Sequence, residues 1–403
     1  MQKERLIIKN FFTLKDVDIE LGKYNVFIGE QASGKSLILK TLFFFRSILF
    51  APIRMYRTDT EELSKMFIQL FCTSLNIRDY NHNMSIDYVY GDYTIHIQIT
   101  DRKFFIGYSD NLLNVYTQKR NLLLEHYQNL QKNDTYDDML RFSIMELETQ
   151  RAVENSGLGK ISLFKFLPAG RMVFFTLLNN MFNIVGNDKQ NLNSLLVNFG
   201  QDYQKAFSEY QNIRDDTKIR LIKFDELSGK ILKGKYIYDQ LGGYLQQNDL
   251  QTKLVDGSSG QQEFLPVYMI LHHYLLSGHE CGNLYIEEPE AHLYPSAQKA
   301  ITELLVYVTN ATNSDGLYIT THSPYILTVL NNLILANDVK DKQTLFDKEL
   351  LVSFEEVRAY YIADGRARDL RDMENRLISA YNLDKVSEQT ALDFDKLLDL
   401  KYE

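Results

Sequence analysis

The sequence predicts an α/β fold: a parallel sheet that carries a phosphate-binding loop, flanked by an antiparallel β subdomain and an inserted helical lobe. Short apolar runs at Tyr24–Ile28, Leu284–Ile286 and Leu317–Thr320 are each followed by polar residues and then by a helical pattern, which is typical of parallel strands in α/β proteins. The stretch 84–109 instead alternates apolar and polar residues around Gly91-Asp92, which predicts an antiparallel meander.

The bulk composition is that of an ordinary globular protein. With 403 residues, 45% of them hydrophobic and 24% charged, the chain is long enough for roughly two to three domains, or for one large domain with an insertion. The net charge of −9 neither requires nor excludes nucleic acid, because such binding depends on local patches. No apolar run reaches the roughly 18 residues of a membrane span, and Cys72 and Cys281 have no metal or redox spacing. We therefore expect a cytoplasmic protein with free thiols and no membrane partner.

The stretch GEQASGKS, from residue 29 to residue 36, matches the pattern G-x-x-x-x-G-K-[ST] in full. Such a loop binds phosphate because its glycines let backbone N–H groups turn inward and because the next helix directs its positive end at the anion. The apolar strand before the loop and the helical spacing behind it meet the required context. We therefore expect a nucleotide site made of Gly29, Gln31, Ala32, Ser33, Gly34, Lys35 and Ser36.

A second candidate stretch is CGNLYIEEPEAHLYPSAQ, residues 281–298. An apolar strand runs directly into Glu287 and Glu288, and a helix follows at Pro295. A carboxylate at such a strand end can hold the shell of Mg²⁺, and the next carboxylate can orient or deprotonate an attacking water. Paired glutamates are common on solvated helices, so the specific signal is the strand that leads into them.

A third stretch, GLYITTHSPYIL, places His322 immediately after an apolar strand. A histidine just past the carboxyl end of a strand faces the ligand crevice of a doubly wound sheet. The alternative is a histidine that only caps the following helix.

A fourth stretch contains the turn Gly257-Ser258-Ser259-Gly260-Gln261, which runs into an apolar helix. Its hydroxyl groups, backbone amides and helix N-terminus form a second anion-binding end. One phosphate loop does not need two such ends, so we expect the second end to meet the nucleotide of a partner subunit.

These four stretches, in the chain order GEQASGKS, GSSGQQ, YIEEPEAHLYP and ITTHSP, resemble ABC-type P-loop ATPases, and more narrowly the bacterial branch shared by OLD ("overcoming lysogenisation defect") proteins and SMC-like heads. The resemblance implies that Lys35 and Ser36 grip phosphate and Mg²⁺, that Glu287 supports Mg²⁺, and that Glu288 is the catalytic base. It also implies that the ABC signature, the stretch that closes on the γ-phosphate of the partner subunit, consists of Ser258, Ser259, Gly260 and Gln261. His322 would be the switch histidine that senses this phosphate. Glu290 and His292 would belong to the loop that crosses the dimer interface.

The sequence departs from the family pattern at several points. The signature reads GSSGQ instead of LSGGQ, which suits the OLD-like branch, and Glu287 replaces the more usual Asp. Gln31 stands where SMC-like heads often carry Asn. Gln98 is a weak candidate for the family's Q-loop glutamine.

We expect residues 1–58 and 250–345 to form the ATPase core, with an insert at 59–249 that holds the meander and a helical stretch from about 112 to 155. The insert lacks the sustained heptads of a coiled coil. Within it, Leu163–Phe175 is expected to form a strand, a turn and a helix. A strand followed by PAxR recurs in the OLD-like branch, and this resemblance implies that Arg171 lies near the nucleotide or the dimer seam. The alternative is an arginine that holds a turn through backbone bonds.

Each of two charged stretches could have either a structural or a functional role. Lys230, Lys233 and Lys235 lie on a predicted hairpin and could face DNA, although edge protection is the more common role of such lysines. Residues 346–403 predict a hairpin and a helix that could dock a partner. The helix carries Asp393, Asp395 and Asp399 at a spacing that favours a solvated face over a metal site.

The leading hypothesis is an ATP- and Mg²⁺-dependent switch that forms a homodimer or higher homo-oligomer and regulates a separate nuclease-like effector in antiphage defence or DNA surveillance. The alternatives are an SMC-like DNA-maintenance ATPase that binds DNA directly and, less favoured, a transporter ATPase subunit.

Overall fold

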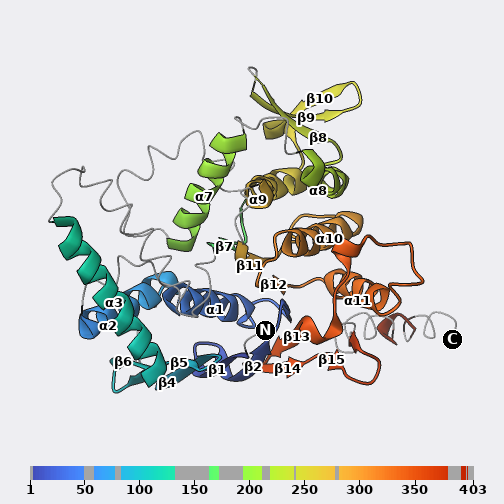
Figure 1. The fold of residues 1–403 in the computed structure, drawn as a ribbon. Helices are drawn as coiled ribbons and strands as arrows, with labels where there is room; N and C mark the ends of the chain where they lie inside the picture. The colour runs from blue at the N-terminus through green and yellow to red at the C-terminus, as the bar shows by residue number, and fades with distance from the viewer. Residues whose placement is uncertain are drawn as a thin grey trace.

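One mixed sheet runs through the part of the chain that the computed structural model describes, which is residues 3–49, 59–77, 83–131, 163–171, 194–210, 218–239, 242–276, 281–379, 392–395 and 397. In spatial order the strands are β6-β5-β4-β1-β2-β14-β13-β3-β12-β11-β7 (Figure 1). Their bounds are β1 (Glu4–Phe11), β2 (Leu14–Leu21), β3 (Tyr24–Ile28), β4 (Met84–Tyr90), β5 (Tyr93–Thr100), β6 (Lys103–Tyr108), β7 (Leu163–Leu167), β11 (Cys281–Glu287), β12 (Gly316–Thr321), β13 (Val357–Ala363) and β14 (Arg366–Asp369). The predicted α/β class is confirmed.

The strands β13, β3, β12, β11 and β7 are parallel neighbours, and their register puts their carboxyl ends at one edge of the sheet. Ile286 of β11 lies beside Ile319 of β12, and Thr321 of β12 lies beside Ile28 of β3. All residues of β3 and β12 are buried, as a parallel strand covered on both faces requires.

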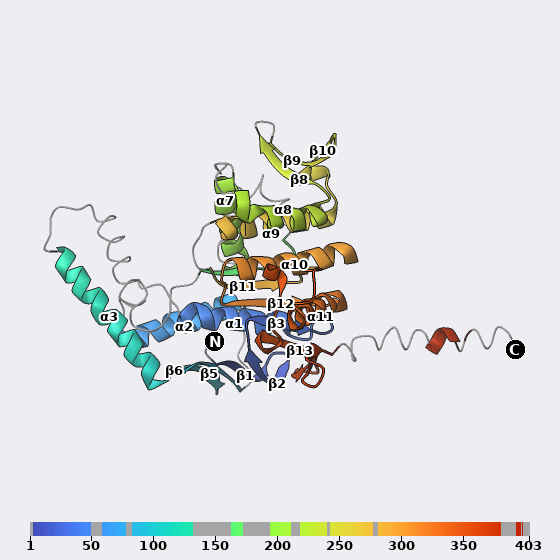
Figure 2. The same ribbon diagram turned by 45° about the vertical axis from the view of Figure 1, so that its right-hand side comes forward.

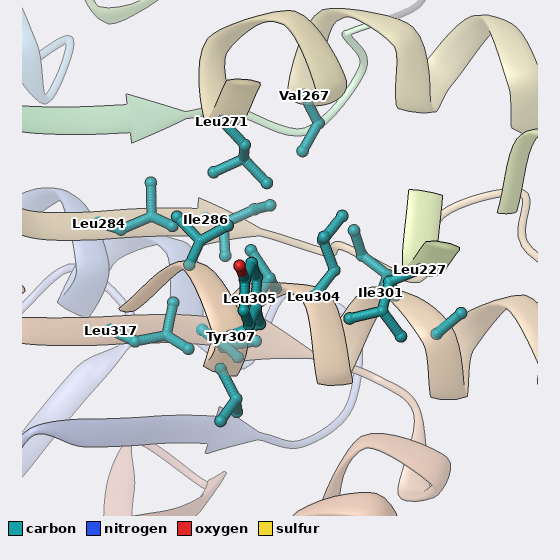
Figure 3. Packing of buried hydrophobic residues seen from close by; sticks show 14 of the residues in the cluster. Leu227, Val267, Leu271, Leu284, Ile286, Ile301, Leu304, Leu305, Tyr307 and Leu317 are labelled. Carbon is teal, nitrogen blue, oxygen red and sulfur yellow. The ribbon is translucent and has the colours of Figure 1, made fainter. Parts of the chain in front are cut away.

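Helices cover both faces of this parallel part. On one face lies α1 (Lys35–Leu49); α2 (Thr60–Ser74) and the start of α3 (Asp110–Gln131) extend the same layer over the antiparallel strands. On the other face lie α7 (Ser194–Tyr210), α8 (Lys218–Leu232), α9 (Ser259–Leu276), α10 (Pro295–Ala311) and α11 (Pro324–Asp338). Neighbouring residues of one strand divide between the two cores: Val26 packs into the α9–α10 side and Phe27 into the α1 side. Figure 3 shows the side chains that meet between the strands and α8, α9 and α10, among them Leu227, Val267, Leu271, Leu284, Ile286, Ile301, Leu304, Leu305 and Leu317.

The predicted meander forms as β4, β5 and β6, joined in antiparallel register. Within the expected insert at 59–249, β4 pairs with β1 and β7 pairs with β11, so parts of that range belong to the main sheet. The periodicity of the meander could not reveal this, because it does not identify the strand that pairs with the meander's edge. The helical stretch expected from 112 to 155 begins within α3, and residues 132–155 lie outside the described residues.

The segment after residue 345 is likewise part of the sheet. β13 lies between β3 and β14, and the predicted hairpin is the β13–β14 pair. The hairpin turn docks on the β1–β2 turn, where the Lys15 N–H donates to the Gly365 carbonyl at 2.8 Å. Two short strands, β15 (Arg371–Asp372) and β16 (Leu377–Ile378), follow. Asp393 and Asp395 lie on an exposed helical turn, and Asp399 is outside the described residues.

The stretch predicted as a lysine hairpin is instead the end of a helix, a turn and a strand. Lys230 belongs to α8 and pairs with Glu226 at 2.7 Å, Lys233 lies in the turn, and Lys235 begins β8 (Lys235–Asp239). β8 pairs with β9 (Gly242–Gln247), which pairs with β10 (Leu250–Lys253), in a small sheet at the far end of α8 and α9 from the meander (Figure 2). The helical spacing of Leu227, Ile231 and Leu232, all buried, explains why α8 continues this far.

None of the helices in the described ranges has both the length and the apolar character needed to cross a lipid bilayer.

A buried ion pair joins the antiparallel and parallel parts of the sheet. Arg46 of α1 donates from Nε and from one terminal nitrogen to the two carboxylate oxygens of Glu4 on β1, at 3.1 and 2.6 Å. The hydroxyl groups of Tyr88 and Tyr318 also donate to this carboxylate, at 2.6 and 3.2 Å. Glu4 and Arg46 are 5% and 4% exposed, so both charges depend on these partners in place of water.

We predict that Glu4→Gln lowers the free energy of unfolding by about 3 kcal/mol, because it leaves a guanidinium group buried without its counter-charge. Urea denaturation measures the change. The control is Asp18→Asn, which removes the exposed partner of Arg5 and should cost less than about 1 kcal/mol. Equal losses in the two variants would contradict the role given to the buried pair.

Candidate functional site

The phosphate-binding loop lies against β2 at one end and β13 at the other, and both close approaches require glycine. Gly34 has a φ of +103°, and a Cβ there would come within 2.5 Å of a methyl group of Leu14 at the start of β2. A Cβ on Gly29 would lie 2.2 Å from the carbonyl oxygen of Ile362 on β13. Side chains at these positions would therefore push the loop out of the sheet edge. The loop also borders a cleft of about 670 Å³ that is lined on its other side by the β13–β14 hairpin, including Tyr361, Arg366 and Arg368.

Lys35 begins α1 and folds back over the loop. Its ammonium group donates to the carbonyl oxygens of Gly29 and Glu30 at 2.9 and 2.6 Å. Burial lowers the pKa of Lys35, while the nearby carboxylates of Glu288 and Glu290 act in the opposite direction. The ammonium group thus lies where the loop, α1 and the carboxyl ends of the strands meet.

Glu287 ends β11 and is 3% exposed. Its Oε2 accepts the Ala169 N–H at 3.1 Å, and Lys40 Nζ approaches Oε1 at 3.6 Å. Within the described residues Oε1 has no hydrogen-bond partner. Lys40 follows Ser36 by one helical turn, so both lie on the face of α1 that is directed at β11. A buried carboxylate oxygen that has only this ion pair and accepts no hydrogen bond from the described residues fits a Mg²⁺ site, because Mg²⁺ takes few protein ligands and leaves the rest of its shell to water and phosphate.

Glu288 is the first residue after β11, and its φ of +43° is in the left-handed region. Its carboxylate lies 3.2 Å from His322 Nε2, and both side chains are about one-third exposed. His322 does not cap the next helix, because the cap of α11 is Ser323, whose hydroxyl accepts the Tyr325 N–H. The capping alternative for His322 is therefore wrong, and the side-chain contact of the imidazole is with the Glu288 carboxylate.

Glu290, which was predicted in a loop at the dimer interface, is buried against its own chain. It is 9% exposed and turns into its own chain. Its Oε1 accepts the Thr321 hydroxyl at 2.6 Å and the His322 N–H at 2.7 Å. Glu290 thereby fixes the backbone that carries His322. His292, the other residue predicted at the interface, is exposed.

The signature stretch opens α9 with a reciprocal cap. The Gln261 N–H donates to the Ser258 hydroxyl at 3.4 Å, while Gln261 Oε1 accepts the Ser258 N–H at 2.9 Å. This is a capping box, and it presents the N-terminal end of α9 with Ser258 and Ser259 exposed. Gly260 is buried, and a Cβ there would lie 2.7 Å from the His292 carbonyl oxygen.

Arg171 does not contact the surface where a nucleotide would approach. Its side chain is 1% exposed and donates to the carbonyl oxygens of Pro168, Glu287 and Glu288, at 3.0, 2.7 and 3.0 Å. These bonds fit the alternative of an arginine that holds a turn through backbone bonds, and a place near the nucleotide or the dimer seam stays a prediction. The physical reason is that a buried guanidinium fills its donor positions with the carbonyl groups next to it.

Gln98 is not part of this site. It lies on β5, which β4, β1, β2, β14 and β13 separate from β3. The loop that does contact the end of β11 is the one after β7, through Ala169 and Arg171. A strand pattern alone cannot say which strands are neighbours, and this caused the error.

Sequence reasoning missed Glu263, which is 2% exposed and pairs with Arg171. A signal was present, since Glu263 is a lone charge at the start of the apolar run EFLPVYMIL. A charge in an otherwise apolar helix needs a buried partner. Taken together, the described residues place Lys35, Glu287, Glu288 and His322 at one edge of the sheet.

Comparison with known proteins agrees with this geometry. Residues 1–327 match the family model described as the AAA ATPase domain. No curated protein matches the sequence.

Solved structures with some similarity include SMC head domains and RecF. The SMC head domain from Pyrococcus furiosus, with an extended coiled coil and bound to the C-terminal domain of ScpA, is 12% identical with a TM-score of 0.41 over 97% of this chain and 100% of that one. The SMC head domain from Thermotoga maritima is 9% identical with a TM-score of 0.40 over 92% and 98%. The recombination mediator protein RecF is 12% identical with a TM-score of 0.34, again over 92% and 98%. Because these TM-scores are below 0.5, the similarities carry no functional information.

The family match includes the phosphate-binding loop, the carboxylates that follow β11 and the histidine that follows β12. Because this match takes in most of the chain, the protein belongs to the AAA ATPase domain family and is an ATPase.

Proposed function

We propose that this ATPase is an ABC-type, Mg²⁺-dependent switch that closes as a homodimer around ATP and controls a separate nuclease-like effector. The observation that carries the proposal is the meeting of four groups at one sheet edge: the ammonium of Lys35, the carboxylate of Glu287, of which Oε1 accepts no hydrogen bond from the described residues, and the Glu288–His322 pair at 3.2 Å. These are the groups that phosphoryl transfer to water requires.

In the proposed reaction the oxygen of a water molecule attacks the γ-phosphorus of ATP, the bond to the β–γ bridging oxygen breaks, and ADP leaves. Glu288 takes a proton from the attacking water, and His322, held by Glu290, keeps the carboxylate directed at it. Lys35 balances the negative charge of the phosphate oxygens, and Ser36 and Glu287 would hold Mg²⁺. When bound, Mg²⁺ would neutralise charge on the β- and γ-phosphates.

The proposed homodimer follows from the capped end of α9. This end offers exposed Ser258 and Ser259 and the positive end of a helix of 18 residues. A γ-phosphate that is held by Lys35 of one subunit could be enclosed by this end of the other. We therefore propose that each ATP lies between Lys35 of one protomer and Ser258 of its partner.

The proposed role as a regulator rests on the OLD-like motif set in its observed order: GEQASGKS, GSSGQQ, YIEEPEAHLYP and ITTHSP. An ATP-dependent dimer has two states, so its opening and closing can be read by another protein. We propose a nuclease-like partner of a bacterial antiphage or DNA-surveillance system. Direct DNA binding through the lysine stretch is less favoured, because Lys230 is engaged by Glu226.

We predict that Glu288→Gln slows ATP hydrolysis by at least about 100-fold while ATP binding is kept, because the amide cannot take a proton from water. The variant should accumulate as an ATP-bound dimer, which light scattering with and without ATP and Mg²⁺ would detect. Lys35→Ala is the matched control and should lose ATP binding itself. A Glu288→Gln protein that stays monomeric at saturating ATP would count against the enclosed nucleotide.

For His322→Ala we expect turnover to fall by about 10- to 100-fold with a melting temperature within about 2 °C of the parent protein. The imidazole is one-third exposed and contacts the Glu288 carboxylate, so its loss affects the reaction more than the fold. Phosphate release and thermal denaturation measure the two effects. A large drop in melting temperature with normal turnover would show that the histidine is structural.

A pull-down with Glu288→Gln and ATP tests the proposed partner, since this variant should hold the closed state. We expect a nuclease-like protein among the co-purifying proteins identified by mass spectrometry, and its loss when Lys35→Ala is the bait. If nucleic acid co-purifies and no protein does, the proposed regulator role is wrong and a DNA-maintenance ATPase is the better account.

A further inference from the structure

Arg171 and Glu263 form a buried link between α9 and the carboxyl end of β11. The Arg171 N–H donates to Glu263 Oε1 at 3.2 Å, and Arg171 Nε lies 3.4 Å from the same oxygen. On the opposite side, the terminal nitrogens of the guanidinium donate to the carbonyl oxygens of Glu287 and Glu288 at 2.7 and 3.0 Å. One side chain thus joins the helix that carries the signature to the backbone that carries the proposed base.

The two ends of this link differ in what they would contact. Glu263 is on the second turn of α9, just behind Ser258 and Gly260 at its N-terminal end. In the proposed dimer that end meets the ATP bound to the partner. Glu288, in contrast, acts on the ATP bound to its own subunit. The link therefore runs from one ATP site to the other.

The surroundings of Arg171 make the link stiff. Its guanidinium is 1% exposed, and burial lowers the pKa of Arg171. The surrounding carboxylates have the opposite effect and raise this pKa; they belong to Glu263, Glu290, Glu287 and Glu288. A buried cation cannot exchange its protein partners for water without a large cost, so it must follow Glu263 when α9 shifts. At the other end, Glu288 has a left-handed backbone that its neighbours must hold in place.

A small movement at this position would have a large effect on hydrolysis. Displacing a reacting group by about 1 Å can cost about 100-fold in rate. A second contact reinforces the coupling, because buried Gly260 lets the first turn of α9 approach the carbonyl oxygen of His292, four residues after Glu288. Movement of α9 is therefore communicated to the 287–292 segment at two points.

We propose that Glu263 and Arg171 are a positioning pair that couples the two ATP sites of the dimer. Contact of α9 with the partner's ATP sets the position of Glu263, and Arg171 passes this position to the backbone of Glu288 in the same subunit. Each subunit then hydrolyses its own ATP efficiently when the partner also holds ATP. This inference rests on the proposed ATP-enclosing dimer.

Mixed dimers test the coupling. In a dimer of one intact subunit and one Lys35→Ala subunit, isolated with two affinity tags, ATP binds to the intact subunit while the α9 of that subunit faces a site without ATP. The quantity to measure is the coupling ratio, defined as turnover per ATP-binding subunit in the two-site dimer divided by that in the mixed dimer. We expect a coupling ratio of about 10 or more for the parent protein.

Glu263→Gln in the ATP-binding subunits should bring the coupling ratio to about 1, whatever the absolute turnover, because the amide no longer holds the guanidinium by charge. A merely structural pair would change both turnovers and leave the ratio as it was. Arg171→Lys is the second variant, since one ammonium group cannot reproduce the planar fork that reaches Glu263 and both carbonyl oxygens. It should also lower the ratio.

Glu303→Gln is the matched control. Glu303 is a buried glutamate on α10 that pairs with Lys299 at 3.7 Å, and its loss should leave the coupling ratio unchanged. A folded Glu263→Gln or Arg171→Lys protein with the parent's ratio overturns the coupling while leaving the dimer intact. A parent protein that hydrolyses ATP as a monomer overturns both the coupling and the proposed function.

Discussion

The common register of β7, β11, β12 and β3 is the constraint on which the rest of the structure depends. Parallel pairing puts Leu167, Ile286, Ile319 and Val26 side by side, so the strands end at one level. The residues that follow these ends are those with chemistry: the loop 29–34, the Glu287–Glu288 pair, and His322. A slip of one residue would exchange the side chains that pack against α1 with those that pack against α9 and α10, so the close packing of these two different cores fixes the register and with it the site's geometry. The hydrophobic core is thus the reason that polar groups from distant parts of the sequence meet.

Buried charge has two uses in this molecule. The Glu4–Arg46 pair, with the tyrosines around it, fastens the antiparallel strands to the α1 face and contributes to the integrity of the sheet. The Arg171–Glu263 pair lies on the other face, between α9 and the end of β11. Replacing a buried ion pair by apolar residues often costs little stability, so an ion pair beside proposed catalytic groups calls for a role other than stability. The directional hydrogen bonds from the guanidinium to the backbone carbonyls of Glu287 and Glu288 fit a role in positioning these two residues.

The sequence predicts those features of the site that are local in the chain. The strand–loop–helix around Lys35, the strand that ends at Glu287 and the strand before His322 all have patterns that a short window contains. Such short windows could not predict which strands from distant parts of the chain pair with one another. The meander was expected within the insert at 59–249, and the pairing of β4 with β1 was not predicted. The segment after residue 345 was expected as a hairpin and a helix that could dock a partner, and the place of β13 beside β3 was not predicted either. Gln98 was misplaced for the same reason, and the burial of Glu290 was not predicted, because burial and neighbours depend on tertiary contacts that periodicity does not encode.

The most direct test of the account is a structure of Glu288→Gln determined with ATP and Mg²⁺. The account predicts two protomers with each γ-phosphate between Lys35 of one and Ser258 of its partner, and with Mg²⁺ near Ser36 and Glu287. A structure in which ATP occupies the loop of a protomer while the N-terminal end of α9 contacts no nucleotide of a second copy would contradict it. In that case hydrolysis would be complete within one chain, and neither an ATP-enclosing dimer nor a link between two sites would remain.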